Sequence, residues 1–338
     1  MLLTLHLPGL LLPEAIRTDT LFDLQAPSLS LLLGRARREE QPGNWLAKAF
    51  DHAGPLPSAA LRKVGAGGTA SGQWLCLDPV HFAVSREGIH LQDPDQLALR
   101  DAEAEALLAA VTPVFASFGE LSASCPAHWE IRLAQPLTIE TIDLPEAIGR
   151  AIDPMLPGGP DGRALRRALA EVQTLLHAHP VNRNRDALNQ PTVSSLWPWG
   201  LGSLPASVSL PWQCVWSADP VISGLCALAG TPCLLPPEGF QLASGNVLAI
   251  VPTLASHLQA RDVHAWRDTL IEIDKHWLKP AITAVKRGEC GELRVVASGS
   301  DHPGTVSVFS LKRGDLWRFW RRPRPLTGLG DPGRDKPA

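Results

Sequence analysis

Residues 175–202 read LLHAHPVNRNRDALNQPTVSSLWPWGLG, and the interpretation of the whole chain starts from this run. It holds histidine, asparagine, arginine, serine and tryptophan side chains at a density that no other stretch reaches. Arginine offers a planar fork that fits a carboxylate or a phosphate, and asparagine both donates and accepts hydrogen bonds. Loops that carry such groups on a rigid scaffold often form binding sites. The run therefore indicates a pocket for a small phosphorylated or carboxylated ligand.

Eight side chains of this run are the candidate ligand-binding groups: His179, Asn182, Arg183, Arg185, Asn189, Ser195, Trp197 and Trp199. Ser194 is the candidate nucleophile if the protein is an enzyme. We expect the two tryptophans to shield the pocket from water where a strand turns into a loop. The alternative interpretation is structural. In that case the polar groups are solvated or capping residues, and the tryptophans belong to the core.

Composition limits the classes of protein to consider. The chain has 338 residues, 45% of them hydrophobic, which is enough for two domains or for one domain with an insertion. A formal net charge of −3 argues against a general nucleic-acid binder. No apolar run approaches the ~20 residues that a membrane-spanning helix needs, and prolines interrupt the apolar start, so we expect no signal peptide and no membrane partner. The sequence does not indicate a protein partner.

The six cysteines form no CxxC pair, which argues against a zinc site. We interpret them as small core residues and expect a reducing, cytoplasmic location.

Hydrophobic periodicity predicts an α/β fold. The predicted strands are residues 2–7, 213–216, 247–251 and 292–297, and the predicted helices are residues 28–50, 101–112, 162–177 and 262–286. Because ligands of α/β sheets bind at the carboxyl ends of strands, we expect the loops at 194–202 and 299–304 to meet at one site.

A stretch rich in glycine, proline, serine and alanine at residues 54–72 marks a domain boundary. We predict a core built from residues 1–72 and 188–325, an inserted α/β domain at 73–187, and a flexible tail at 326–338.

Five segments carry a family resemblance. In chain order they are WLCLDPVHFAVSREGIHLQD (74–93), HPVNRNRDALNQPTVSSLWPWGLGSLP (179–205), DPVISGLCALAG (219–230), DVHAWRDTLIEIDKHWLKPAI (262–282) and SGSDHPG (298–304). This order resembles the cofactor-independent phosphoglycerate mutases, and the tryptophan-rich run is closest to the RpfE-type bacterial regulatory group. The resemblance covers residues 70–325. It implies an alkaline-phosphatase-like core sheet flanked by helices, with an inserted α/β domain.

The resemblance also implies a metal site, and the sequence departs from it there. Asp301 and His302 match the family's late metal-binding pair, although a surface turn explains them equally well. The family places Asp-Gly after its first strand and a nucleophile soon afterwards, whereas here His6 and Glu14 are the nearest candidate ligands and no histidine follows His302.

These departures favour a degenerate member of the family. We expect it to bind a small anion such as a phosphoglycerate in a regulatory role, with no cofactor. The alternative is an active phosphoglycerate mutase or phosphohydrolase that uses manganese or zinc.

Overall fold

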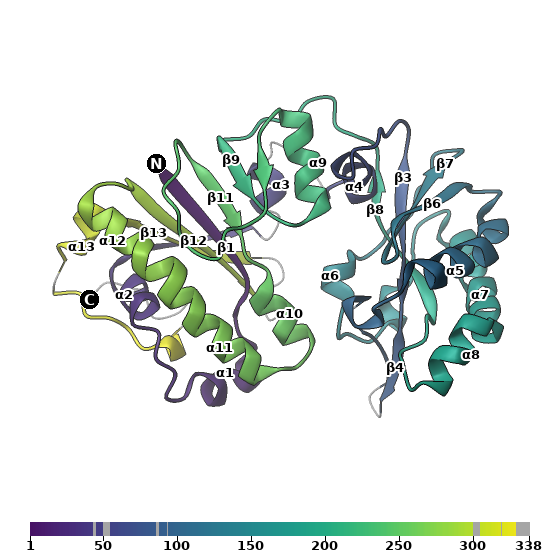
Figure 1. Ribbon diagram of the computed structural model, residues 1–338, viewed down its shortest axis with the longest axis horizontal. Helices are drawn as coiled ribbons and strands as arrows, with labels where there is room; N and C mark the ends of the chain where they lie inside the picture. The colour runs from purple at the N-terminus through teal and green to yellow at the C-terminus, as the bar shows by residue number, and fades with distance from the viewer. Residues whose placement is uncertain are drawn as a thin grey trace. The chain divides into compact units, whose positions relative to one another are not determined.

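The structure is a computed structural model, shown in Figure 1, and it describes residues 1–42, 45–49, 55–85, 88–92, 94–299, 305–318 and 320–328. The chain forms two compact units. Unit 1 comprises Met1–Gly54, Val208–Asp219 and Cys226–Ala338, and unit 2 comprises Pro55–Ser207 and Pro220–Leu225. Helix α9 (Pro220–Ala229) contributes residues to both units.

Unit 1 is built on a seven-stranded sheet with the order β10-β9-β11-β1-β12-β13-β2. Its strands are β1 (Leu2–Leu11), β2 (Arg37–Pro42), β9 (Cys214–Trp216), β10 (Cys233–Leu234), β11 (Val247–Ile250), β12 (Glu292–Gly299) and β13 (Thr305–Lys312). The pairs from β10 to β12 are parallel, and β13 and β2 add antiparallel pairs. The central strand β1 is largely buried: Leu3, Leu5 and Leu7 lie on one side of the sheet, and Thr4 and His6 lie on the other.

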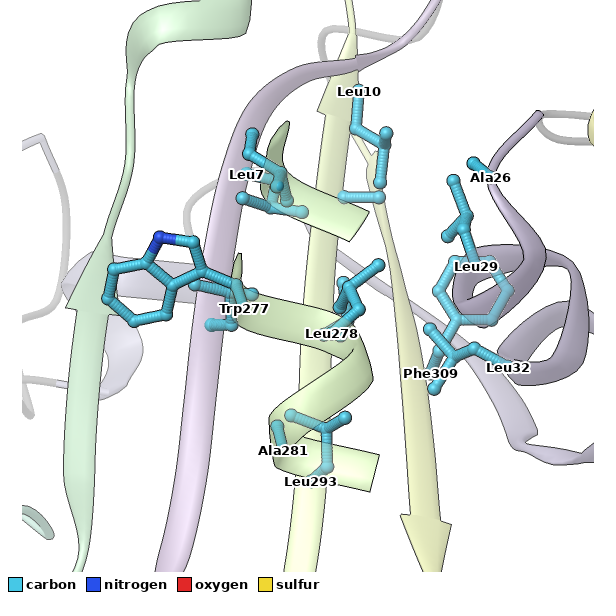
Figure 2. Close-up of a cluster of buried hydrophobic side chains, with 14 of the residues drawn as sticks. Leu7, Leu10, Ala26, Leu29, Leu32, Trp277, Leu278, Ala281, Leu293 and Phe309 are labelled. Atoms are coloured by element: carbon cyan, nitrogen blue, oxygen red, sulfur yellow. The ribbon is translucent and has the colours of Figure 1, made fainter. Parts of the chain in front are cut away.

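Helices flank this sheet, and the apolar faces of several of them pack on the same side of it. They are α1 (Glu14–Leu21), α2 (Pro27–Arg35), α3 (Trp45–Ala49), α10 (Thr253–Gln259), α11 (Val263–Ile273), the π-helical turn η3 (Asp274–Leu278), α12 (Lys279–Arg287), α13 (Arg313–Leu316) and the 3-10 turn η4 (Leu326–Gly328). Figure 2 shows side chains from β1, α2, η3, α12, β12 and β13 gathered in one hydrophobic cluster. This arrangement confirms the fold class expected from the sequence, an α/β fold with a large central sheet flanked by helices.

The π-helical turn begins at a residue that contacts a helix far away in the sequence. Asp274 is buried there, and its carboxylate accepts hydrogen bonds from the backbone N–H groups of Ser28 (3.2 Å) and Leu29 (2.7 Å). These N–H groups belong to the first turn of α2, which has no partner of its own for them. Asp274 therefore caps α2.

Unit 2 contains a four-stranded antiparallel sheet with the order β6-β7-β3-β8. Its elements are β3 (Trp74–Val80), β4 (Phe82–Ser85), β5 (Gly88–Leu91), β6 (Gly119–Cys125), β7 (His128–Leu133), β8 (Ser195–Gly202), α4 (Ser58–Gly65), α5 (Asp101–Phe115), α6 (Leu144–Ala147), α7 (Gly162–Ala178), α8 (Pro180–Ala187) and the 3-10 turns η1 (Pro94–Leu97) and η2 (Asp153–Met155). Alternate residues of β3 serve two cores: Leu75 and Leu77 face α5 and α7, while Trp74 and Cys76 pack with α4 and β8.

The unit boundaries differ from the expected ones. Residues 58–65 and 188–207 were assigned to the core, but α4 and β8 belong to unit 2. Strand β8 forms a ladder with β3, in which Trp197 pairs with Asp78 and Trp199 with Cys76. Pro198 is tolerated because β8 is an edge strand. Residues 194–202 are thus mostly a strand of the smaller sheet, not a loop leaving the larger one.

Two further expectations are corrected. The predicted helix at 28–50 ends at Arg35, because the charged residues after it form edge strand β2 against β13. The predicted tail starts too early, since Leu326 is buried in the core of unit 1. Within the described ranges, no helix combines the length and the apolar composition that crossing a membrane requires.

Candidate functional site

Helix α8 begins at the first candidate residue. His179 is the N-cap, and its Nδ1 accepts a hydrogen bond from the backbone N–H of Val181 at 3.2 Å. Pro180 stands at the first helical position, where the missing N–H costs nothing. His179 therefore has a structural partner, because its ring satisfies one of the free donors at the start of the helix.

Asn182 is buried and uses its amide entirely inside the protein. Its Nδ2 donates to the carbonyls of Leu176 (2.7 Å) and Val193 (2.8 Å), and its Oδ1 accepts from the N–H of Val193 (2.9 Å). These bonds join the end of α7 to the segment that enters β8. Asn182 has no free donor for a ligand.

Arg185 is also buried, and all three of its guanidinium nitrogens have partners inside the protein. Its Nη1 forms an ion pair with Glu103 Oε2 at 2.9 Å, its Nε donates to the carbonyl of Pro191 at 2.7 Å, and its Nη2 donates to the carbonyl of Leu97. Arg100 binds the other oxygen of Glu103, and this hydrogen bond is the main reason why the pKa of Glu103 is lowered. Through these contacts Arg185, a candidate ligand-binding group on the sequence alone, joins α5, α8 and η1.

Asn189 ends α8 in a left-handed conformation, with φ of 53°. The N–H of Gln190 donates to the carbonyl of Arg185 at 2.8 Å, and the N–H of Asn189 donates to that of Asp186 at 2.9 Å. These two bonds define a Schellman motif, in which asparagine is one of the few residues that accept positive φ.

Ser194 lies beside a histidine that sequence reasoning did not select. Its Oγ accepts from the N–H of Phe82 at 3.0 Å and lies 3.4 Å from Nδ1 of His81. The same Nδ1 is 2.7 Å from the carbonyl of Thr192, so it must carry the proton and donate it. It therefore cannot accept a proton from Ser194, and the pair does not form a nucleophile and base in this geometry.

Ser195, Trp197 and Trp199 are buried along β8. Gln173 donates to Ser195 Oγ at 3.3 Å, and the indole N–H of Trp197 donates to the carbonyl of Ile142 at 3.0 Å. The indole N–H of Trp199 donates to Asp78 Oδ2 at 2.7 Å. The tryptophans thus fill the core of unit 2, where each buried N–H has a partner.

Trp199 belongs to a buried charged network. The guanidinium of Arg62 forms a bidentate pair with Asp78 (2.8 and 2.9 Å) and also donates to Glu130 at 2.5 Å. Burial raises the pKa of Glu130, although Arg62 opposes this rise. The network holds α4 against β3 and β7. The sequence pattern did not predict that Arg62, Asp78 and Glu130 would be partners.

One candidate remains available to a ligand. Arg183 is exposed on α8, and its guanidinium has no ion pair or hydrogen bond with the described residues. It borders a hollow of about 580 Å³ whose lining includes Gln173, His177, Asp186 and Ser194. His177 and Gln173 are four residues apart on α7, so the helical spacing put them on one face. We call this the α8 hollow.

A second hollow, of about 560 Å³, lies in unit 1 where β10 and β11 end. Its lining includes Glu238, Asp268, Glu272 and His276, and His276 Nε2 is 2.9 Å from Glu272 Oε2. Carboxyl ends of parallel strands are the usual ligand position in such sheets. Its acidic lining suits an anion less well than the α8 hollow does.

The carboxyl end of β1 does not fit the metal that the family resemblance implies. The resemblance implies an Asp-Gly pair after the first strand, whereas the sequence at the end of β1 is Pro8-Gly9 followed by the buried Leu10 and Leu11. Helix α10 packs so closely that a Cβ on Gly9 would lie 2.6 Å from the backbone of Ala255. His6 belongs to the central strand of the sheet, and burial of its imidazole lowers its pKa to about 4. No group of three histidine, cysteine, aspartate or glutamate side chains in the described residues is placed to share a metal ion.

Asp301 and His302 lie outside the described residues, as does the rest of the predicted loop at 300–304. Of the two strands whose loops were expected to meet, β8 belongs to the four-stranded sheet and β12 to the seven-stranded sheet.

No protein-family model matches this chain, and no curated protein matches it by sequence. Solved structures do. The chain is similar to a cofactor-independent phosphoglycerate mutase from Thermoplasma acidophilum, with 16% identity, 97% of this chain and 94% of that chain covered, and a TM-score of 0.47. It is also similar to the PH0037 protein from Pyrococcus horikoshii, with 13% identity, 97% and 91% covered, and a TM-score of 0.55. The second likeness shows a shared fold across nearly the whole chain.

Proposed function

We propose that this chain is a phosphoglycerate-mutase-like protein of the RpfE type, within the alkaline-phosphatase-like superfamily, that no longer performs the chemistry of the enzymes. In this proposal it binds a small phosphorylated or carboxylated ligand and acts as a regulator in the cytoplasm. The observation that carries the proposal is the end of β1. The resemblance implies a metal ligand and a nucleophile after the first strand, whereas this chain has the buried Leu10 and Leu11 there and a close approach of α10 to Gly9.

The α8 hollow is the proposed ligand site. Arg183 supplies a guanidinium that is not committed to the described residues, and His177 and Gln173 add donors on the facing helix. A guanidinium binds a carboxylate or phosphate through two parallel hydrogen bonds, each stronger than a neutral one. This role was expected for Arg183 and Arg185 together, and the proposal keeps it for Arg183 alone.

The second candidate function is an active metal-dependent mutase or phosphohydrolase. The hollow at the ends of β10 and β11 favours it, because Glu238, Asp268 and His276 stand near the usual catalytic edge of such a sheet. This function requires manganese or zinc ligands that the described residues do not supply together.

Calorimetry with 3-phosphoglycerate and with inorganic phosphate tests the proposal. We expect Arg183→Ala to weaken binding by roughly tenfold, since a charge-assisted hydrogen bond contributes about 1.5–3 kcal/mol and 1.4 kcal/mol is a factor of ten. Arg183→Lys should recover part of the loss. Arg167→Ala removes an exposed arginine from α7 and serves as the matched control.

Turnover assays with manganese separate the two candidates. Under the proposal, wild type binds the anion and shows no mutase or phosphohydrolase activity. Turnover that is lost on Glu272→Gln supports the enzyme instead. If neither anion binds wild type at millimolar concentration, the α8 hollow is not an anion site.

A further inference from the structure

A separate cavity of about 270 Å³ lies in unit 1, on the sheet face opposite the main hydrophobic cluster. Side chains alternate along a strand, so Leu3 and Leu5 face that cluster while Thr4 faces the other way. Thr4 pairs across the sheet with Arg294, and both line the cavity with Val296 and Val308. The cavity lies toward the amino ends of β1 and β12, away from the edge where the sheet's ligands are expected.

Thr4 presents a polar group to the cavity without a partner. The residue is 2% exposed, and its Oγ1 makes no hydrogen bond with the described residues. Burying a hydroxyl without a partner is unfavourable, and native proteins pair most such groups. A ligand atom in the cavity would supply the missing partner.

Two indoles form apolar walls. Trp45 and Trp212 are 8% and 6% exposed and both line the cavity. The ring of His6 packs edge-on against Trp45, with centroids 5.1 Å apart and planes at 83°. Burial lowers the pKa of His6 to about 4, so the imidazole is neutral at pH 7 and the wall stays uncharged. Such walls suit a ring or a short branched alkyl group.

Arg294 supplies the charge. Its side chain is 40% exposed and its Nη2 lies 3.1 Å from Glu292 Oε1, which leaves other N–H groups free to bind. Lys312 lies 3.4 Å from the other oxygen of Glu292. Glu292 therefore keeps a cationic partner when Arg294 turns toward a ligand.

We propose that this cavity binds a small amphipathic carboxylate: one ring or short branched chain between Trp45 and Trp212, its carboxylate on Arg294 and an oxygen on the Thr4 hydroxyl. The volume of about 270 Å³ falls just below the usual range of small-molecule pockets, which limits the ligand to about one ring. The site is distinct from the α8 hollow, because its lining residues all belong to unit 1.

Phenylacetate is the probe, with benzyl alcohol as its uncharged counterpart, and binding is measured by calorimetry and by saturation-transfer NMR on the full chain. We expect phenylacetate to bind wild type and benzyl alcohol to bind at least tenfold more weakly. Arg294→Gln should weaken phenylacetate by about tenfold or more, as loss of a charge-assisted bond does. Arg287→Gln, an exposed arginine of α12, is the control that should bind as wild type does.

Thr4→Val distinguishes a binding role from a structural one. Valine has the same shape and removes the unpaired hydroxyl, so we expect the Tm to rise by about 2–4 °C while phenylacetate binds more weakly. A structural hydroxyl would give a lower Tm instead, and that result overturns the proposal. The proposal is also overturned if phenylacetate at about 10 mM does not bind wild type, or if wild type and Arg294→Gln bind it equally well.

Discussion

Arg185 gives the first prediction at the scale of single residues. Replacement by alanine leaves Glu103 buried with Arg100 as its remaining ion-pair partner, and it leaves the carbonyls of Leu97 and Pro191 without this donor. Breaking a buried ion pair costs about 3–5 kcal/mol, and the remaining partner reduces this to roughly 2–4 kcal/mol. Urea unfolding measures the loss. Arg183→Ala, on the exposed face of the same helix, should change stability by less than about 0.5 kcal/mol.

On the sequence alone Arg185 is a candidate ligand-binding group, and an arginine that only binds a ligand could be replaced with little change in stability. An unchanged unfolding midpoint for Arg185→Ala would show that the guanidinium is not part of the core of unit 2.

Asp143 gives a second prediction at this scale. Burial, with help from the charge of Glu146, raises the pKa of its carboxyl from 3.8 to about 6. The folded state therefore binds the proton more tightly than the unfolded state does. Its stabilisation is complete below about pH 4 and is lost as the pH rises through about 6. We expect Asp143→Asn to be more stable than wild type by about 1–3 kcal/mol at pH 7 and equal to it near pH 4. Parallel stability curves for the two proteins between pH 4 and 7 would contradict this.

At the scale of elements, the end of α8 depends on the left-handed conformation of Asn189. Glycine adopts positive φ without strain and a β-branched residue does not. We expect Asn189→Gly to match or slightly exceed wild-type stability, and Asn189→Val to lose about 1–2 kcal/mol in chemical denaturation. Gln190→Val, which alters the next residue without changing φ, is the control. Equal stability of the glycine and valine variants would mean that the Schellman motif does not form.

At the scale of the whole molecule, the two units have separate hydrophobic cores. Leu293 is fully buried in the core of unit 1, and Phe115 is fully buried in that of unit 2. Truncating such a side chain to alanine costs about 2–5 kcal/mol. We expect Leu293→Ala to increase hydrogen exchange in unit 1 alone and Phe115→Ala to increase it in unit 2 alone, as mass spectrometry of peptic fragments will resolve. If either variant exposes both units, the chain unfolds as one cooperative body.

Local patterns in the sequence determined the α/β class and several elements. The stripe of apolar residues at 262–286 predicted the continuous segment from α11 to α12, and the acidic start of 101–112 predicted α5. The apolar run at 2–7 predicted the central strand β1. A helix depends on residues within a few turns of one another, and a buried strand depends on its own apolar side chains. The hydrophobic periodicity of the sequence is therefore enough to predict both.

Tertiary structure alone decided what the polar residues do. Arg185 finds Glu103 at a separation of 82 residues, and Ser194 finds His81 at 113. Strand β8 joins the smaller sheet because it pairs with β3. Residues 37–42, four of which are charged, form a strand rather than a helix because they pair with the edge of β13. An arginine or a serine has the same local pattern whether it binds a ligand or a distant carboxylate. Its role therefore depends on which partner the fold brings within hydrogen-bonding distance and whether water is excluded there.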